Sequence, residues 1–277
     1  MLKQRVITGA IMALVAILAI VFLPAHALIA VLGLVTLAAL WEWSDLAGLR
    51  GYPVRALYCL LFVGAMFGVL FGTHLLDPAP RLWLIVELLG IAALWWLIAL
   101  SWVSRFPARS ERWSSVWVRA AMGWFALLPA WFAFAYLRLQ PRGEWLILFL
   151  LGLVAAADIG AYFSGRRFGR HKLAPAVSPG KSWEGFWGGL ASSLLVAVLA
   201  WRLLWPEAIA LPALLIVAAI TVLASVLGDL LESMVKRERG VKDSSNLLPG
   251  HGGFMDRLDS LSAAAPVFAL GLLLAKW

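Results

Sequence analysis

Two things are scarce in this 277-residue chain: cysteine and charge. Its one cysteine, Cys59, lies inside an apolar run, which excludes a disulfide framework and a cysteine-based metal site. Charged residues make up only 14% of the chain, whereas soluble globular domains contain about 25%. With 63% hydrophobic residues and a mean hydropathy of +0.90, a soluble fold would expose more apolar surface than water tolerates. The composition excludes a soluble enzyme, a disordered chain and a secreted disulfide scaffold, and it indicates a polytopic membrane protein.

Nine apolar runs are long enough to cross a bilayer, which takes roughly 20 residues in a helix. The runs are long and continuous rather than short and alternating, so we exclude a transmembrane β-barrel. We predict an all-α fold, with residues 1–277 forming a single integral membrane domain. The predicted transmembrane helices cover residues 6–23, 27–43, 56–73, 82–103, 119–137, 145–163, 186–205, 209–228 and 261–277.

The basic residues indicate how the chain is oriented. The 23 Lys and Arg residues outnumber the 15 Asp and Glu residues, giving a net charge of +8. If the N-terminus lies in the cytoplasm and the helices alternate, most of these cations fall in cytoplasmic segments, as the positive-inside rule requires. We therefore predict a cytoplasmic or inner membrane protein with a cytoplasmic N-terminus and an outer C-terminus. The positive-inside rule explains the basic charge, so the expected partner is membrane lipid and no nucleic acid partner is needed.

Two features leave alternatives open. Lys3 and Arg5 before the first run, followed by Ala25-His26-Ala27, also fit a signal peptide with its cleavage site, although 6–23 is long for that. Gly64, Gly68 and Gly72 form a G-x-x-x-G ladder in the third run, which permits close helix contact. We expect the ladder to serve packing within the protein, with a homodimer as the alternative.

Three carboxylates fall inside apolar runs, namely Glu42, Glu87 and Asp158. An ionisable group in a membrane segment is costly and is a functional candidate by default. Glu42 and Asp158 lie near the cytoplasmic ends of their runs, so snorkelling or structural pairing explains them equally well.

A dense polar stretch follows the eighth run. If the helix continues past Gly228, then Asp229, Glu232, Ser233 and Lys236 share one face, although a solvated amphipathic helix would look similar. A glycine-rich polar loop over 242–253 comes next. Glycine lets backbone N–H groups approach phosphate oxygens closely, and a following helix N-terminus adds partial positive charge.

Charged residues in and around this loop suit a polyphosphate. Carboxylates are hard oxygen ligands for Mg²⁺, which typically binds one or two of them together with substrate phosphates. The candidate metal ligands are Asp229, Asp256 and Asp259, and the candidate phosphate-neutralising residues are Lys236, Arg237, Lys242 and Arg257.

A second polar cluster lies between the sixth and seventh runs, in the segment Ser178-Pro179-Gly180-Lys181-Ser182-Trp183-Glu184-Gly185. A P-loop is rejected, because Pro175 stands where that motif needs glycine and we predict no strand before it. Lys181 can still meet a phosphate as a point charge, with Ser178 and Ser182 as hydroxyl donors. A plain basic cytoplasmic loop is the alternative.

These two segments carry a resemblance to a known family. Residues 233–259 read SMVKRERGVKDSSNLLPGHGGFMDRLD, which resembles the signature of the phosphatidate cytidylyltransferases, also called CDP-diacylglycerol synthases. Residues 178–185 resemble the family's second motif, with Ser182 where threonine is common.

The resemblance implies that CTP and phosphatidic acid react to give CDP-diacylglycerol and pyrophosphate, at catalytic segments 164–185 and 229–259 on the cytoplasmic face. For this reaction the candidate carboxylate ligands predict Mg²⁺ as cofactor, with a second cation left open. The residues and the resemblance together predict as catalytic Asp229, Lys236, Arg237, Lys242, Asp243, Asp256, Arg257 and Asp259. The substrate-binding residues it implies are Ser178, Lys181, Ser182, Glu184, Ser233, His251, Gly252 and Gly253.

Two other function classes remain as alternatives. A CTP-dependent lipid alcohol kinase would use similar architecture, but it would release CDP instead of pyrophosphate. A secondary transporter would also explain carboxylates within membrane helices, yet transporter sites cluster near the bilayer midplane, whereas the charge here is concentrated at one face.

Overall fold

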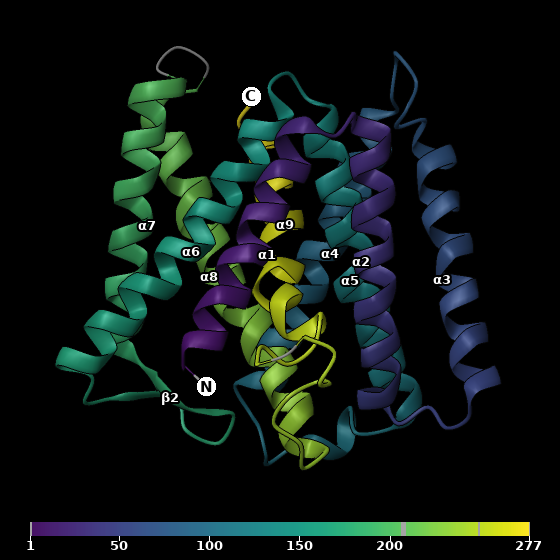
Figure 1. The fold of residues 1–277 in the computed structure, drawn as a ribbon, viewed down its shortest axis with the longest axis vertical. Coiled ribbons are helices and arrows are strands. Elements are labelled where there is room, and N and C mark those ends of the chain that lie inside the picture. The colour runs from purple at the N-terminus through teal and green to yellow at the C-terminus, as the bar shows by residue number, and fades with distance from the viewer. Residues whose placement is uncertain (1, 206–208, 249, 277) are drawn as a thin grey trace.

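The computed structural model describes residues 2–205, 209–248 and 250–276, and within these residues the chain forms a bundle of nine α-helices (Figure 1). A short 3₁₀ turn, η1 (Ser110–Arg112), lies between the fourth and fifth helices. The helices are α1 (Leu2–Phe22), α2 (Ala25–Ala47), α3 (Tyr52–Thr73), α4 (Leu82–Val103), α5 (Val116–Leu139), α6 (Gly143–Phe168), α7 (Trp183–Leu204), α8 (Leu211–Glu238) and α9 (Met255–Leu274).

The helices confirm the predicted polytopic all-helical class. Eight of them are long and apolar enough to cross a membrane, and α1 adds a shorter apolar segment, Ile7–Phe22. The largest differences concern α8, which continues ten residues past its predicted end at 228, and α9, which begins at Met255 instead of 261. Both predicted limits were set where charged residues appear. The helices continue through those residues because their side chains pair inside the protein.

A small hairpin was not predicted. Strands β1 (Lys172–Ala174) and β2 (Ser178–Ser182) pair antiparallel, with Lys172 opposite Ser182 and Ala174 opposite Ser178. The hairpin joins α6 to α7, which pack closely because glycines line their contact; a Cβ at Gly189 would meet the carbonyl oxygen of Ala157. Three- and five-residue strands carry too little alternating pattern to be recognised in the sequence.

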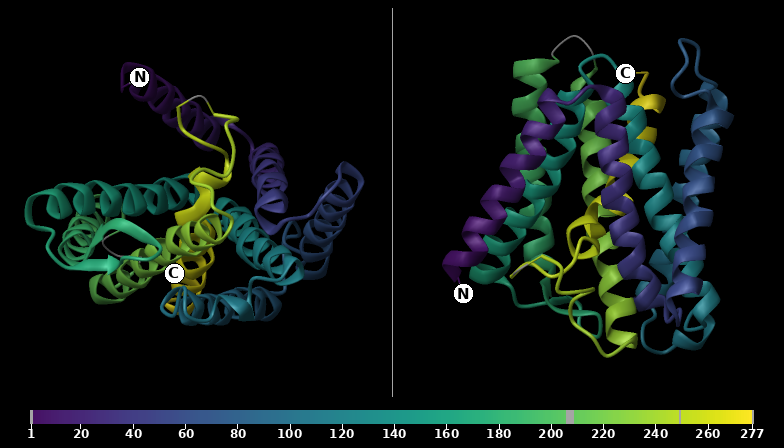
Figure 2. Two further views of the ribbon diagram at one scale, coloured as in Figure 1. Left: turned by 90° about the horizontal axis from the view of Figure 1, so that it is seen from below. Right: turned by 45° about the vertical axis from the view of Figure 1, so that its right-hand side comes forward.

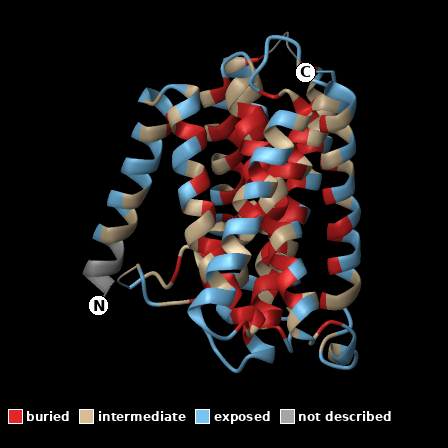
Figure 3. Ribbon diagram, turned by 90° about the vertical axis from the view of Figure 1, so that its right-hand side faces the viewer, coloured by how far each residue is buried: buried red, intermediate tan, exposed pale blue. Residues whose placement is uncertain are grey.

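Burial is concentrated on the inner faces of the helices (Figure 3). The helix α5 is the most enclosed of the candidate spans, whereas α3, at the edge of the bundle, is the least buried. Among the described residues, nothing lies within 4 Å of a Cβ built at Gly64, Gly68 or Gly72. The expectation that this glycine ladder packs within the protein is therefore wrong for the described chain.

The two predicted catalytic segments gather at one end of the bundle. In Figures 1 and 2, the β1–β2 hairpin and the loop between α8 and α9 lie toward the same end as the N-terminus, and the C-terminus lies at the opposite end. Seen from below, the loop reaches from α8 and α9 toward α1 (Figure 2, left). The nine helices of the described residues agree with the predicted number, and eight of them qualify as candidate spans.

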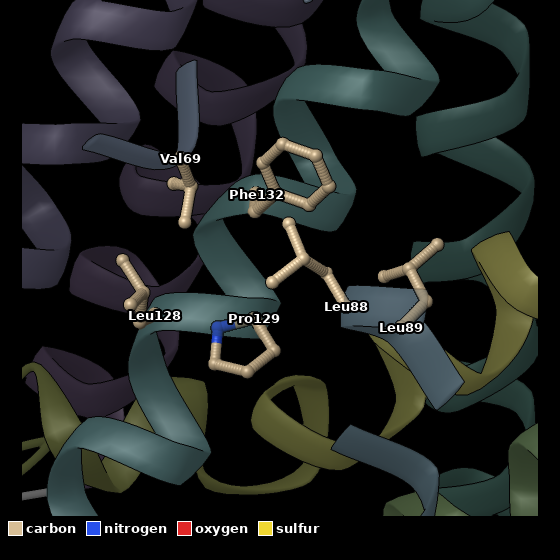
Figure 4. A pocket seen from close by; sticks show the side chains of 6 residues that line it. All are labelled: Val69, Leu88, Leu89, Leu128, Pro129 and Phe132. Atoms are coloured by element: carbon tan, nitrogen blue, oxygen red, sulfur yellow. The ribbon is translucent and has the colours of Figure 1, made fainter. Parts of the chain in front are cut away.

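An apolar pocket lies between α3, α4 and α5 (Figure 4). Its lining has no charged side chain, so it does not suit a nucleotide or a phosphate. The lining residues are Val69, Leu88, Leu89, Leu128, Pro129 and Phe132.

Candidate active site

The polar face of α8 is buried. Asp229, Glu232, Ser233 and Lys236 fall on one helix face, and Glu232, Ser233 and Lys236 are 0%, 9% and 8% exposed. A solvated amphipathic helix would expose these side chains, so that alternative is excluded. Because unpaired buried charges are costly, each of these groups needs a partner.

Lys236 joins α8 to the start of α9. Its Nζ lies 3.0 Å from Oε2 of Glu232 and 2.7 Å from Oδ1 of Asp256. The other oxygen of Asp256, Oδ2, accepts from the N–H of Ser244 at 2.9 Å and from the N–H of Gly253 at 2.8 Å, and it shares the Ser244 hydroxyl, also at 2.9 Å, with Glu42. Asp256 is thus held by four protein donors, and a metal ion bound there would have to replace one of them.

Lys181 joins the hairpin to α8. Its Nζ lies 2.6 Å from Oδ2 of Asp229, whose Oδ1 accepts a hydrogen bond from the Ser233 hydroxyl at 3.1 Å. Arg237 strengthens the same junction by donating from Nε to the carbonyl oxygen of Val177 at 3.2 Å. Burial alone would lower the pKa of Lys181, but nearby carboxylates, led by Asp229, raise it above its usual range. Lys181 is therefore positively charged at neutral pH.

Two further carboxylates complete the cluster around Lys181. Asp158 of α6 and Asp259 of α9 both lie close enough to act on its charge. The helices α8 and α9 cross closely at Gly228, where a Cβ would collide with the Asp259 carbonyl oxygen. This close crossing brings Asp259 near the cluster. Because Gly228 has no side chain, Asp229 and Asp259 lie close enough for their carboxylates to repel one another.

The two glycines after His251 make room for carboxylates. Gly252 has φ +78°, and a Cβ there would meet Oδ2 of Asp256, while a Cβ at Gly253 would meet Oε2 of Glu42. The N–H of Gly253 donates to Oδ2 of Asp256, and the predicted approach of this loop to a phosphate stays a prediction. His251 packs beside α1, where a Cβ at Gly9 would lie 3.2 Å from its Nε2.

Several predicted substrate-binding residues have local partners. The Ser182 hydroxyl caps α7 by accepting from the N–H of Gly185 at 3.1 Å. The Glu184 carboxylate accepts from the N–H groups of Arg170 and His171, and His171 Nδ1 lies 2.6 Å from its Oε1. Both residues thereby fix the ends of the hairpin.

The remaining predicted residues lie around the cluster. Ser178 opens β2 and is half-buried. Lys242 and Asp243 are exposed in the α8–α9 loop, and Arg257 is exposed on the first turn of α9, where it acts on Asp158.

Sequence reasoning did not assign three residues that the fold places at this site. Glu42 of α2 accepts four hydrogen bonds from the α8–α9 loop and the start of α9. Asp158 lies beside Lys181, and Glu232 pairs with Lys236. The sequence feature that could have indicated Glu42 and Asp158 was a carboxylate within an apolar run. For Glu232 it was the position on the same helix face as Asp229 and Lys236.

The cluster contains more carboxylates than basic side chains. Five carboxylates (Asp158, Asp229, Glu232, Asp256 and Asp259) act on three cations (Lys181, Lys236 and Arg257). Oε1 of Glu232 is buried and has no hydrogen-bond partner in the described chain. Within the same residues, no three His, Cys, Asp or Glu side chains form a preformed metal site. The oxygen donors and the excess of carboxylates over basic side chains nevertheless suit a divalent cation.

Comparison with known proteins gives matches over the whole chain. The model described as "Cytidylyltransferase family" matches residues 3–275. The chain is 44% identical to a phosphatidate cytidylyltransferase of Pseudomonas aeruginosa over 277 residues, which covers 100% of this chain and 99% of that protein. It is 41% identical to the Haemophilus influenzae phosphatidate cytidylyltransferase over 284 residues, covering 97% and 98% of the two chains. A Brucella suis protein of the same name is 46% identical over 132 residues, 47% of this chain and 48% of that protein.

Proposed function

Because the chain belongs to the cytidylyltransferase family, we propose that it catalyses the phosphatidate cytidylyltransferase reaction, from CTP and phosphatidic acid to CDP-diacylglycerol and pyrophosphate. The observation that carries the proposal is the full-length identity to relatives of that name. The buried cluster of lysines and carboxylates at one end of a membrane bundle supports it, because a lipid phosphate must meet a soluble triphosphate near the membrane surface.

The proposed reaction is an in-line displacement at phosphorus. A phosphate oxygen of phosphatidic acid forms a bond to the α-phosphorus of CTP, the bond from that phosphorus to the bridging oxygen breaks, and pyrophosphate leaves with the electron pair. The attacking oxygen is already anionic at neutral pH, so the reaction needs no general base and no covalent enzyme intermediate.

The cations of the cluster offset the charge of two polyanions. Lys181 is held at Asp229 and Lys236 at Asp256, so each ammonium group is oriented before substrate binds. Preorganised charge of this kind stabilises a transition state without reorganisation. Arg237, Lys242 and Arg257 add positive charge at the same end of the bundle, and Asp243 and His251 lie in the loop between them.

Mg²⁺ is the proposed cofactor. Asp229 and Asp259, which already repel one another, would hold it, and Asp256 is the third predicted ligand. A bound Mg²⁺ would neutralise phosphate charge and polarise the α-phosphate. Ser233 supports the first ligand through its hydrogen bond to Oδ1 of Asp229, and the excess of carboxylates leaves room for a second cation.

The direct test is incubation of the purified protein with labelled CTP, Mg²⁺ and phosphatidic acid. We expect a CDP-lipid and pyrophosphate in equal amounts, with neither formed when the phosphatidic acid is omitted. Release of CDP together with a phosphorylated lipid would instead identify a kinase, and the absence of any reaction would contradict the proposal.

We also propose that the active site faces the cytoplasm, as the distribution of basic residues predicts. In a Cys59→Ala background, a cysteine at position 110, in η1, should react only with reagents that reach the cytoplasm. A cysteine at position 79, in the α3–α4 loop, should react only from the other side. Reversed labelling would contradict the orientation.

Replacing Lys181 with alanine tests the hairpin. We expect Lys181→Ala to lower kcat/KM at least about tenfold, or roughly 1.4 kcal/mol, because the charge opposite Asp229 is lost. Folding in detergent should be retained, since both side chains of this pair are about one quarter exposed. Lys172→Ala, at an exposed position on the same hairpin, is the matched control. Normal kcat/KM in Lys181→Ala would identify the hairpin as an ordinary basic loop.

A further inference from the structure

Glu42 is a buried carboxylate that contacts the α8–α9 segment from a distant helix. It lies on α2 and is 2% exposed. Its Oε1 accepts from the Ser245 hydroxyl at 2.7 Å and from the N–H of Phe254 at 3.0 Å. Its Oε2 accepts from the Ser244 hydroxyl at 2.9 Å and from the N–H of Met255 at 2.8 Å.

These four bonds satisfy Glu42 without a cation. No ion pair to Glu42 is found among the described side chains, and its charge is stabilised by the N–H groups at the start of α9, where the helix dipole favours an anion. With both oxygens occupied, Glu42 has no free position for a substrate or a metal ion. Its contacts are therefore entirely with the segment that carries the active-site residues.

The contact continues from Glu42 to the lysine of the cluster. The Ser244 hydroxyl lies 2.9 Å from Oε2 of Glu42 and 2.9 Å from Oδ2 of Asp256. Asp256 in turn holds Lys236 through its other oxygen at 2.7 Å. A Cβ at Gly253 would meet both Oε2 of Glu42 and the Ser244 hydroxyl, so the loop fits Glu42 only with glycine at this position.

We propose that Glu42 is a positioning residue for the reaction. It holds residues 244–255 against α2, and thereby fixes Asp256 and the orientation of Lys236. This inference rests on the proposed function, because Lys236 is taken to act on the substrates. Removing the carboxylate charge should release the loop without removing any group that touches a substrate.

The test compares Glu42→Gln with Glu87→Gln, the matched change of an exposed carboxylate on α4. A glutamine can accept on one side only, so the N–H of either Phe254 or Met255 loses its acceptor. We expect kcat to fall about thirtyfold, which corresponds to about 2 kcal/mol, while both KM values change less than about threefold. Glu87→Gln should behave as the unmodified protein.

Hydrogen exchange separates positioning from general destabilisation. In Glu42→Gln the N–H groups of Phe254 and Met255 should exchange faster, with the change confined to residues 242–257 and absent from α5. Unchanged exchange at 254 and 255 would overturn the proposal, and so would faster exchange throughout the bundle. This readout does not depend on activity, so it is distinguishable from a failure of the proposed function.

A double-mutant cycle with Asp256→Asn tests the route. If Glu42 acts through Asp256, adding Glu42→Gln to Asp256→Asn should lower kcat little further. Fully multiplicative losses would overturn the route. If Glu42→Gln fails to fold, Ser244→Ala decides the question, because it removes the hydroxyl that lies between Glu42 and Asp256 while the backbone N–H groups still bind both carboxylates. A normal kcat in Ser244→Ala would overturn the proposal.

Discussion

Replacing Asp229 with asparagine is expected to lower the rate of CDP-diacylglycerol formation by at least about a hundredfold, or roughly 2.7 kcal/mol of transition-state stabilisation. Asparagine keeps the size of the side chain but removes the charge that faces Lys181 at 2.6 Å. It also removes a ligand from the proposed cation site beside Asp259. The measurement is the initial rate of labelled CDP-lipid formation as Mg²⁺ is varied, with a higher half-saturating Mg²⁺ concentration expected in the variant.

The combination of Asp229→Asn with Asp259→Asn sharpens this test. If the two carboxylates serve one bound cation, the double variant should lose much less than the product of the two separate losses. Asp77→Asn, in the exposed α3–α4 loop, is the control and should keep a near-normal rate. Multiplicative losses in the double variant, or unchanged Mg²⁺ dependence in Asp229→Asn, would contradict a shared cation site.

Much of this cluster could be predicted from local sequence. The spacing of Asp229, Glu232 and Lys236 at one helical face follows from the 3.6-residue period, and these side chains do share a buried face. Lys181 was predicted to meet a phosphate from a separate segment, and the fold brings it within 2.6 Å of Asp229. Local periodicity and residue chemistry were enough to predict contacts between side chains that are near in sequence or that belong to the two recognised motifs.

The role of Glu42 could not be predicted in this way. Its partners Ser244 and Ser245 are 202 and 203 residues away, and no local pattern indicates which membrane helix lies beside the α8–α9 loop. A carboxylate in an apolar run shows that a partner is needed but does not identify it. The same limit explains why the expectation for the glycine ladder of α3 was wrong. The spacing of the glycines shows that another helix could pack closely there, but it does not show whether one does.

Ser182 and Glu184 illustrate a different limit. Their motif predicted contact with a substrate, which stays a prediction, and it gave no sign that their side chains hold the hairpin and the start of α7. A hydroxyl or carboxylate beside a glycine suits a phosphate site and a helix start equally well. Only the backbone geometry around Ser182 distinguishes the two, and that geometry is set by the β1–β2 pairing that the sequence did not predict.

Replacing Lys236 with methionine is expected to destabilise the protein by about 3–5 kcal/mol, the usual effect of removing one partner from a buried ion pair. The side chains of Lys236, Glu232 and Asp256 are 10%, 0% and 7% exposed. Methionine fills similar space but leaves two carboxylates without their cation inside the bundle. The measurement is the thermal unfolding of the purified variant in detergent, which should begin at a clearly lower temperature than in the unmodified protein.

A second substitution shows whether charge is the cause. Adding Glu232→Gln to Lys236→Met removes one of the two uncompensated charges, so part of the lost stability should return while the rate of CDP-lipid formation stays low. Lys242→Met, at an exposed position of the α8–α9 loop, should change the free energy of unfolding by less than about 0.5 kcal/mol. Unfolding of Lys236→Met at the temperature of the unmodified protein would show that this lysine does not compensate the buried carboxylates. Recovery of activity together with stability in the double variant would show that Lys236 supports the fold and has no part in the reaction.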